Sequence, residues 1–294
     1  MASITANDIL IEYDTFGAPT GRPLLLIMGL GAQMTRWRRE LCELLAAQGH
    51  YVIRFDNRDV GLSQKFGAAG MPDMAKIFAQ ATAGEPVSAA YSLSDMANDA
   101  AALLTALDIQ AAHICGASLG GMIVQIMALE HGSRVKSMTS IMSTTGDPTL
   151  PKATPEAMAA LMSPAGKSLE EVLDRAVKNA AVIGGPGFPA PEAEIRALAQ
   201  SDYERSFYPE GVVRQMAAVA ATGNRRPRLE KLVMPTLVIH GQNDPLIPVS
   251  GGMDTQAAIQ NAVIKVFEGM GHNLPQPLWG GIVEAISTHT RAHD

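Results

Sequence analysis

The feature that most constrains this chain is the short run Gly116-Ala117-Ser118-Leu119-Gly120 together with its flanks. The preceding residues, 111–115, have the pattern of a short buried strand, and the apolar run 122–130 is long enough to begin a helix. Glycines on both sides of the serine let the backbone pass close to neighbouring elements, where a Cβ would clash. The run therefore predicts a strand, a strained turn that presents Ser118, and a helix.

Apolar runs typical of buried strands alternate with helical patterns along most of the chain. A hairpin is expected around Asn7-Asp8, and further strands are expected at 23–28, 51–55, 135–141, 235–240 and 262–267. Helices are expected at 37–47, at 94–107 with Ser92 or Ser94 as the N-cap, and at 280–289. This alternation predicts an α/β fold with a mostly parallel eight-stranded sheet and helices on both faces.

Residues 147–227 interrupt this alternation. The segment is rich in proline, contains several methionines and has helical patterns near 168–181 and 192–201. We expect it to form a helical cap, inserted after the sixth strand between a first core part, 1–146, and a second, 228–294. Its composition predicts an apolar, adaptable pocket.

A second, shorter excursion covers residues 64–91, where 72–80 has the pattern of a helix. Both excursions are expected above the carboxyl ends of the strands, because open α/β sheets bind their ligands there.

The composition argues against several kinds of partner. A net charge of −6 without a basic block disfavours nucleic acid, and no apolar run approaches the roughly 18 residues that span a bilayer. The first residues lack a basic segment followed by an apolar one, so we expect no secretory signal and a cytoplasmic protein. Cys42 and Cys115, the two cysteines, are expected to be buried thiols rather than a disulfide.

Ser118 becomes a nucleophile only if a base removes its proton and an acid orients that base. Where a serine occupies such a strand–turn–helix, its partners follow in the order acid and then histidine. This order favours His272, in a glycine-rich loop after the last strand, and Asp244, just after the strand 235–240. Asp147 is the alternative acid, and a turn-forming role before proline is the structural alternative for Asp244.

Acyl transfer also needs two backbone N–H groups that stabilise the developing oxyanion. Leu119 follows the serine at the start of the helix and is expected to supply one. Leu30, in Met28-Gly29-Leu30-Gly31 after the strand 23–28, is expected to supply the other. A plain glycine turn that ends the strand is the alternative for this loop.

The remaining polar motif, Asp56-Asn57-Arg58-Asp59-Val60-Gly61-Leu62-Ser63, follows the second parallel strand. Its place predicts a structural loop in which Arg58 and Asp56 tie neighbouring loops together. No closely spaced His, Cys and Asp residues suit a metal, and no glycine-rich dinucleotide motif follows the first strand. We therefore expect neither a cofactor nor a metal.

Together these motifs resemble the α/β-hydrolase superfamily over nearly the whole chain, and within it the aclacinomycin methylesterase group of carboxylesterases. The shared motifs are Met28-Gly29-Leu30-Gly31, Asp56-x-Arg58-x-x-Gly61-x-Ser63, Gly116-x-Ser118-x-Gly120-Gly121, Pro235-Thr236-Leu237-Val238-Ile239-His240-Gly241-x-x-Asp244 and Gly269-x-Gly271-His272. The resemblance implies an α/β-hydrolase fold with a Ser118–Asp244–His272 triad and a helical cap that forms the acyl and alcohol pockets. The chain departs from many relatives in having Met28-Gly29 instead of His-Gly, a change that keeps the backbone donor.

The expected activity is cofactor-independent hydrolysis of a small-molecule carboxylic ester through an acyl-enzyme intermediate. The same triad suits a C–C bond hydrolase, a lactonase, an acyltransferase or a perhydrolase. A receptor that retains the triad but turns over slowly is the alternative of another class. Halide displacement and epoxide opening need an aspartate nucleophile, and Ser118 argues against both. The sequence sets neither the natural ester nor the oligomeric state.

Overall fold

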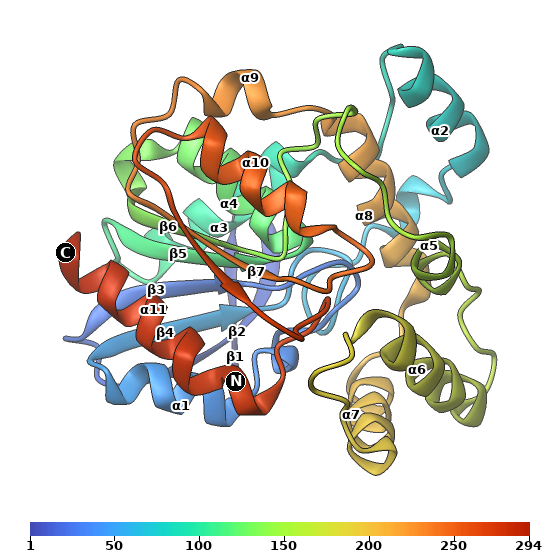
Figure 1. Ribbon diagram of the computed structural model, residues 1–294, viewed down its shortest axis with the longest axis horizontal. Coiled ribbons are helices and arrows are strands. Elements are labelled where there is room, and N and C mark those ends of the chain that lie inside the picture. Colours follow the sequence, from blue (N-terminus) through green and yellow to red (C-terminus); the bar gives the residue numbers. More distant parts are fainter.

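The computed structural model describes residues 1–294, which form one eight-stranded sheet with helices packed around it (Figure 1). The strands are β1 (Ala2–Ala6), β2 (Ile9–Phe16), β3 (Arg22–Ile27), β4 (His50–Phe55), β5 (Ala112–Ala117), β6 (Val135–Ile141), β7 (Thr236–Gly241) and β8 (Val263–Phe267). Their order across the sheet is β1-β2-β4-β3-β5-β6-β7-β8. β2 runs antiparallel to both neighbours, and every other pair is parallel. The predicted fold class is confirmed.

Helices cover both faces of the sheet. They are α1 (Arg39–Ala47), α2 (Met74–Ala83), α3 (Leu93–Ala106), α4 (Leu119–Glu130), α5 (Pro155–Leu161), α6 (Leu169–Ile183), α7 (Glu192–Arg205), α8 (Pro209–Thr222), α9 (Arg226–Leu229), α10 (Val249–Ala258) and α11 (Trp279–Ala292). In Figure 1, α1 and α11 lie on one side of the sheet, and α3, α4 and α10 lie on the other. None of these helices is both long and apolar enough to cross a membrane.

Strand β3 shows how the apolar runs produce this layering. Leu24 and Leu26 are fully buried in the cluster that contains α1 and α11. Leu25 and Ile27 point to the opposite face and are fully buried in the cluster that contains α3 and α4. A strand covered on both faces needs apolar residues at every position, so its sequence shows no alternation.

The predicted elements near the start of the chain form largely as expected. The hairpin pairs β1 with β2 across Asn7-Asp8, where Ala6 lies opposite Ile9. Ser92, rather than Ser94, is the N-cap of α3, and its hydroxyl accepts a hydrogen bond of 3.2 Å from the Asp95 N–H. Both cysteines are buried free thiols, as predicted.

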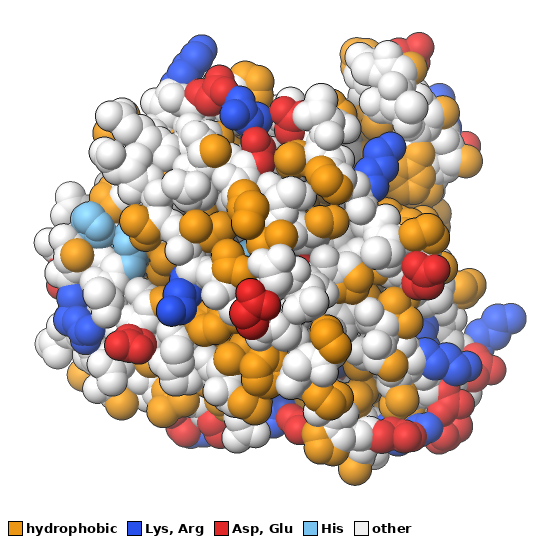
Figure 2. Space-filling model, viewed as in Figure 1, with side chains coloured by type: hydrophobic (Ala, Val, Ile, Leu, Met, Phe, Trp, Pro, Cys, Tyr) orange, Lys and Arg blue, Asp and Glu red, His pale blue; other side chains and the backbone are white.

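The insertion, residues 147–227, holds α5 to α8 and lies at one end of the sheet, near α2 (Figure 1). Arg205 at the end of α7 forms an ion pair of 2.7 Å with Asp56, and Arg214 on α8 forms one of 2.8 Å with Asp59. Both aspartates follow β4, so the insertion is attached to loops at the carboxyl ends of the strands. Charged side chains of both signs gather over α6 and α7 on the face seen in Figure 2.

Arg225 joins the two points at which the chain enters and leaves the insertion. It is buried, and its guanidinium donates to the carbonyl oxygens of Thr144 at 2.8 Å and Gly223 at 2.9 Å. Its Nε also donates to the Gln125 side chain on α4 at 2.9 Å. Burial lowers the pKa of Arg225 to about 10. Arg225, a cation without an acidic partner, therefore connects both ends of the insertion to α4, the helix that follows Ser118.

Two buried histidines predict how stability depends on pH. Burial lowers the pKa of His113 on β5 and of His289 on α11 to about 4, below the ordinary 6.5. Between these two pH values the unfolded chain takes up protons that the folded chain does not. Each histidine therefore contributes stability above pH 6.5 that is lost as the pH falls toward 4, by up to ~1.4 kcal/mol per pH unit.

Urea unfolding of the wild type between pH 7.5 and 4.5 measures this loss. The double variant His113→Gln/His289→Gln is expected to show a flatter dependence over the same window, because both proton-binding groups are gone. An unchanged slope in the double variant would contradict the assignment.

Candidate active site

Ser118 lies on the sharp turn between β5 and α4. Its backbone has φ 55° and ψ −116°, a conformation that costs a side-chain-bearing residue about 1–3 kcal/mol. The turn is close-packed, because a Cβ on Gly116 would lie 2.0 Å from the Gly120 carbonyl oxygen, and one on Gly120 would lie 2.1 Å from the Ile27 carbonyl oxygen. The glycines on both sides of the serine thus permit the turn that presents its hydroxyl.

The structure brings Ser118, His272 and Asp244 together in one chain of hydrogen bonds. His272 Nε2 lies 2.9 Å from Ser118 Oγ, and His272 Nδ1 lies 2.7 Å from Asp244 Oδ2. The imidazole is 8% exposed and the carboxylate is fully buried, whereas Ser118 is half-buried. The serine therefore lies at the accessible end of this hydrogen-bond chain, and the acid lies at its buried end.

The loop after β7 fixes the carboxylate of Asp244. Its Oδ1 accepts hydrogen bonds from the backbone N–H groups of Leu246 at 2.9 Å and Ile247 at 2.8 Å, which leaves Oδ2 for His272. His240 lies fully buried nearby and its Nε2 bonds to the Ile247 carbonyl at 2.8 Å. Burial lowers the pKa of His240, so it stays neutral in this role.

Asp147, the alternative acid, lies elsewhere in the hydrogen-bond network. Its carboxylate accepts from the backbone N–H and the hydroxyl of Thr149, and these bonds lower the pKa of Asp147. It makes no hydrogen bond to His272.

The insertion holds the loop that carries His272. The backbone N–H of His272 donates to the Ile183 carbonyl at the end of α6 at 2.7 Å. Next to this bond, the loop after α6 packs backbone to backbone against the histidine loop, since a Cβ on Gly185 would lie 2.3 Å from the Gly271 nitrogen. A Cβ on Gly271 would in turn lie 2.3 Å from the Gly185 nitrogen. The position of the imidazole thus depends on the insertion as well as on the loop after β8.

The two amides expected to bind an oxyanion both lack a partner within the chain. Leu119 is the first residue of α4, where helix N–H groups have no intrahelical acceptor. Leu30 N–H makes no backbone hydrogen bond, whereas the next amide, Gly31, is occupied by the Gln215 side chain at 2.8 Å. The predicted oxyanion loop, residues 28–34, passes close to the serine, since a Cβ on Gly29 would lie 3.1 Å from Ser118 Cβ.

The segment 56–63 acts as a scaffold for these loops, as expected from its place after β4. Asp56 accepts hydrogen bonds from the Met34 N–H at 2.8 Å and from the Leu62 N–H at 2.9 Å. Arg58 forms a bidentate pair with Asp99 on α3, with N–O distances of 2.6 and 2.7 Å. No group of three or more His, Cys, Asp or Glu side chains is arranged to hold a metal ion.

Comparison with known proteins agrees with this architecture. Residues 22–275 match the family described as alpha/beta hydrolase fold. The chain belongs to this family. The rhodomycin D methylesterase DauP of Streptomyces sp. (strain C5) is 30% identical, over 98% of this chain and 97% of that protein. The rhodomycin D methylesterase DnrP of Streptomyces peucetius is 29% identical over the same shares. The chain is accordingly an ester hydrolase of the carboxylesterase type.

Solved structures of α/β-hydrolases superimpose on the whole chain. A meta-cleavage product hydrolase from Pseudomonas fluorescens has a TM-score of 0.76 at 21% identity and covers 100% of this chain, with 98% of its own length matched. This likeness concerns the fold alone.

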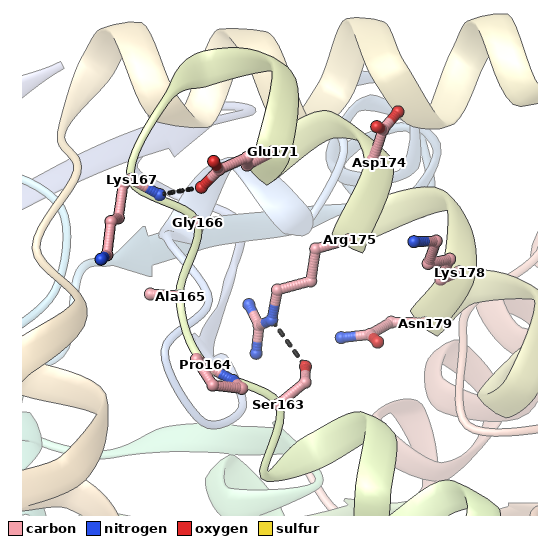
Figure 3. A pocket seen from close by; sticks show the side chains of 10 residues that line it. All are labelled: Ser163, Pro164, Ala165, Gly166, Lys167, Glu171, Asp174, Arg175, Lys178 and Asn179. Carbon is pink, nitrogen blue, oxygen red and sulfur yellow. Dashed lines mark hydrogen bonds between the residues drawn. The ribbon is translucent and has the colours of Figure 1, made fainter.

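A hollow of about 440 Å³ lies in the insertion between the end of α5 and α6 (Figure 3). Most of its lining residues are of polar or charged types: the Arg175 guanidinium points into it and donates to Ser163 Oγ at 2.7 Å, and Asn179 faces the guanidinium. None of the triad residues lines it. It is therefore distinct from the apolar pocket that the composition of the insertion predicts.

Several residues that hold the site are absent from the sequence-based prediction. Gln215, which bonds to Gly31, and Ile183, which bonds to His272, both come from the insertion. The glycine-rich run after Ile183 is the one sequence signal that marks a close backbone approach there.

Proposed function

We propose that this α/β-hydrolase cleaves carboxylic esters by covalent catalysis, with Ser118 as nucleophile, His272 as general base and Asp244 as its orienting acid. The observation that carries the proposal is the continuous hydrogen-bond chain from Asp244 Oδ2 through His272 to Ser118 Oγ. A carboxylate that accepts from Nδ1–H fixes the tautomer in which Nε2 is free to accept the serine proton.

In acylation, Ser118 Oγ attacks the ester carbonyl carbon while His272 Nε2 takes the hydroxyl proton. The carbonyl oxygen becomes an oxyanion that accepts from the Leu30 and Leu119 N–H groups, which have no other acceptor. His272 then gives its proton to the leaving alkoxide oxygen, the C–O bond breaks, and an alcohol departs. The acid part of the substrate stays on Ser118 as an ester.

In deacylation, a water molecule takes the place of the alcohol. His272 Nε2 accepts a proton from the water, whose oxygen attacks the acyl carbon, and the same two amides stabilise the second oxyanion. The proton returns to Ser118 Oγ as the acyl–oxygen bond breaks. The products are one carboxylic acid and one alcohol, and no cofactor enters the balance.

We also propose that the alcohol part of the ester is methanol and that residues 147–227 act as the cap, separate from core parts 1–146 and 228–294. Two full-length relatives are named methylesterases, which supports a small leaving group. The insertion contacts the loops that carry His272 and Gly31, which supports a cap that borders the acyl group.

A panel of esters that varies the acyl and alcohol parts separately tests this proposal. We expect methyl esters of one acid to be hydrolysed faster than its ethyl and butyl esters, and Ser118 to be the residue labelled by an alkyl phosphonate in peptide mass spectrometry. The acyl series then measures which acids the cap accepts.

Two outcomes would contradict the proposal. Absence of hydrolysis across the panel together with an unlabelled Ser118 would exclude the covalent mechanism. Tight binding of an ester with negligible turnover would instead indicate the receptor alternative.

A further inference from the structure

Gln215 is a fully buried polar side chain that connects the insertion to the oxyanion loop. It lies on α8, and its exposed fraction is 0%. Its Oε1 accepts a hydrogen bond of 2.8 Å from the Gly31 N–H, and its Nε2 donates one of 2.9 Å to the Arg58 carbonyl. One amide thus bridges two core loops that follow different strands. A buried amide with both ends paired is strongly oriented, because rotating it would leave two groups unsatisfied.

The oxyanion loop depends on this contact at its centre. Its two ends are held by the core: the Met28 carbonyl accepts from Asn57 at 3.0 Å and the Met34 N–H donates to Asp56 at 2.8 Å. Between these ends, Gly31 has positive φ of 63° and takes its hydrogen bond from the insertion. The Gly31 N–H and the Leu30 carbonyl belong to one peptide. That peptide is joined through the Leu30 Cα to the peptide that carries the Leu30 N–H, so fixing the first restricts the orientation of the second.

Helix α8 is itself fixed in register against the core. Arg214 pairs with both carboxylate oxygens of Asp59, at 2.8 and 3.0 Å, and both side chains are buried. Gly211 packs on the Asp59 backbone so closely that a Cβ there would lie 2.0 Å from its carbonyl oxygen. Val212 covers Gly31, with a methyl carbon 2.7 Å from the place of a Cβ on that glycine. These contacts fix the register of α8 on the core, and this register places Gln215 within hydrogen-bond distance of Gly31.

We propose that Gln215 is a positioning residue for ester hydrolysis, which holds the oxyanion loop so that the Leu30 N–H faces the carbonyl oxygen of an ester on Ser118. The inference rests on the proposed function and adds a requirement to it. The oxyanion hole is complete only while α8 of the insertion is seated on the core, so Gln215 couples the insertion to the catalytic step.

The variant Gln215→Met tests this, because methionine has a similar length and makes neither hydrogen bond. Activity is expressed per site titrated with a phosphonate, so that only folded, reactive protein is counted. We expect kcat to fall about 10- to 100-fold, less than the 10²–10³ typical of deleting a donor outright, with KM within about threefold. The affinity for a trifluoromethyl ketone, which forms a tetrahedral adduct, is expected to fall by the same factor as kcat.

Tyr208→Phe, at the N-cap of α8, is the matched control. It removes the hydrogen bond of 2.7 Å from Arg214 to the tyrosine hydroxyl and leaves the oxyanion loop untouched. Its kcat and ketone affinity are expected within about twofold of the wild type. Gln215→Glu keeps an acceptor for the Gly31 N–H and is expected to lose less kcat than Gln215→Met, which provides a second measurement if the methionine variant folds poorly.

Wild-type kcat and ketone affinity in Gln215→Met, or equal losses in Gln215→Met and Tyr208→Phe, would overturn this inference while leaving the esterase proposal standing. A wild-type protein that hydrolyses no ester and is not labelled at Ser118 is a different failure. That result removes the proposed function, and the role of Gln215 with it.

Discussion

Ser118→Ala is expected to reduce ester turnover by about 10⁶-fold at an unchanged fold, because the acyl-enzyme cannot form without the hydroxyl. His272 and Asp244 would remain hydrogen-bonded to each other, since their contact does not pass through the serine. The alanine also removes the site of phosphonate labelling. Turnover with p-nitrophenyl esters and intact-protein mass spectrometry measure both effects.

Ser287→Ala is the matched control for this substitution. Ser287 is fully buried on α11, its hydroxyl has no hydrogen-bond partner, and it is far from the turn in sequence. We expect wild-type turnover and labelling from this variant. If Ser118→Ala kept full activity, the mechanism proposed here would be wrong, whatever the fate of the fold.

Asp244→Asn is expected to lower kcat by about 10⁴-fold, the effect of forcing the wrong histidine tautomer. The N–H groups of Leu246 and Ile247 donate to Oδ1, so an asparagine would place its carbonyl oxygen there and turn its NH2 toward His272. The imidazole would then accept at Nδ1 and carry its proton on Nε2, where it cannot take the proton of Ser118. Steady-state kinetics and thermal unfolding separate this loss from a loss of stability.

Asp147→Asn distinguishes the two acids considered from the sequence. Asp147 bonds to Thr149 and lies outside the chain of hydrogen bonds to Ser118, so turnover is expected within about twofold of the wild type. A large loss in Asp147→Asn, with full activity in Asp244→Asn, would reverse the assignment of the acid.

The sheet could be predicted from the sequence because its central strands are buried on both faces. Residues 23–28 and 235–240 are nearly continuous apolar runs, and β3 and β7 form there with shifts of about one residue at their ends. The serine turn was equally readable, because glycine spacing and the flanking strand and helix constrain the same few residues.

Helices α8 and α10 could not be predicted in the same way, because their buried residues are small or polar rather than large and hydrophobic. The buried residues of α8 are Gly211, Arg214, Gln215, Ala217 and Ala218. Those of α10 are Gly251, Gly252, Thr255 and Ala258. Periodicity of large hydrophobic residues, the main signal for a helix, is absent from α10, and in α8 it is limited to Val212, Met216 and Val219, none of which is among the buried residues. The contacts that bury them are polar or involve close backbone approach, and they depend on the tertiary structure.

The residues of the candidate site likewise divide into those that local sequence patterns indicate and those that they do not. Ser118, Asp244, His272 and the Leu30 loop follow strands whose ends meet at one edge of the sheet, so their proximity follows from the topology. Gln215 lies 184 positions from Gly31 in sequence and comes from the insertion. No local pattern reports a contact between two such distant residues.

The backbone contact between Gly185 and Gly271 restricts which segments could replace the insertion. A donor segment grafted in place of residues 147–227 would have to present a bare backbone opposite the histidine loop, because a side chain on either glycine would lie 2.3 Å from the nitrogen of the other. Chimeras that exchange the insertion together with residues 269–272 preserve this fit. The unit that can be exchanged without disturbing this contact is thus discontinuous in sequence: the insertion together with the strip of the His272 loop on which it rests.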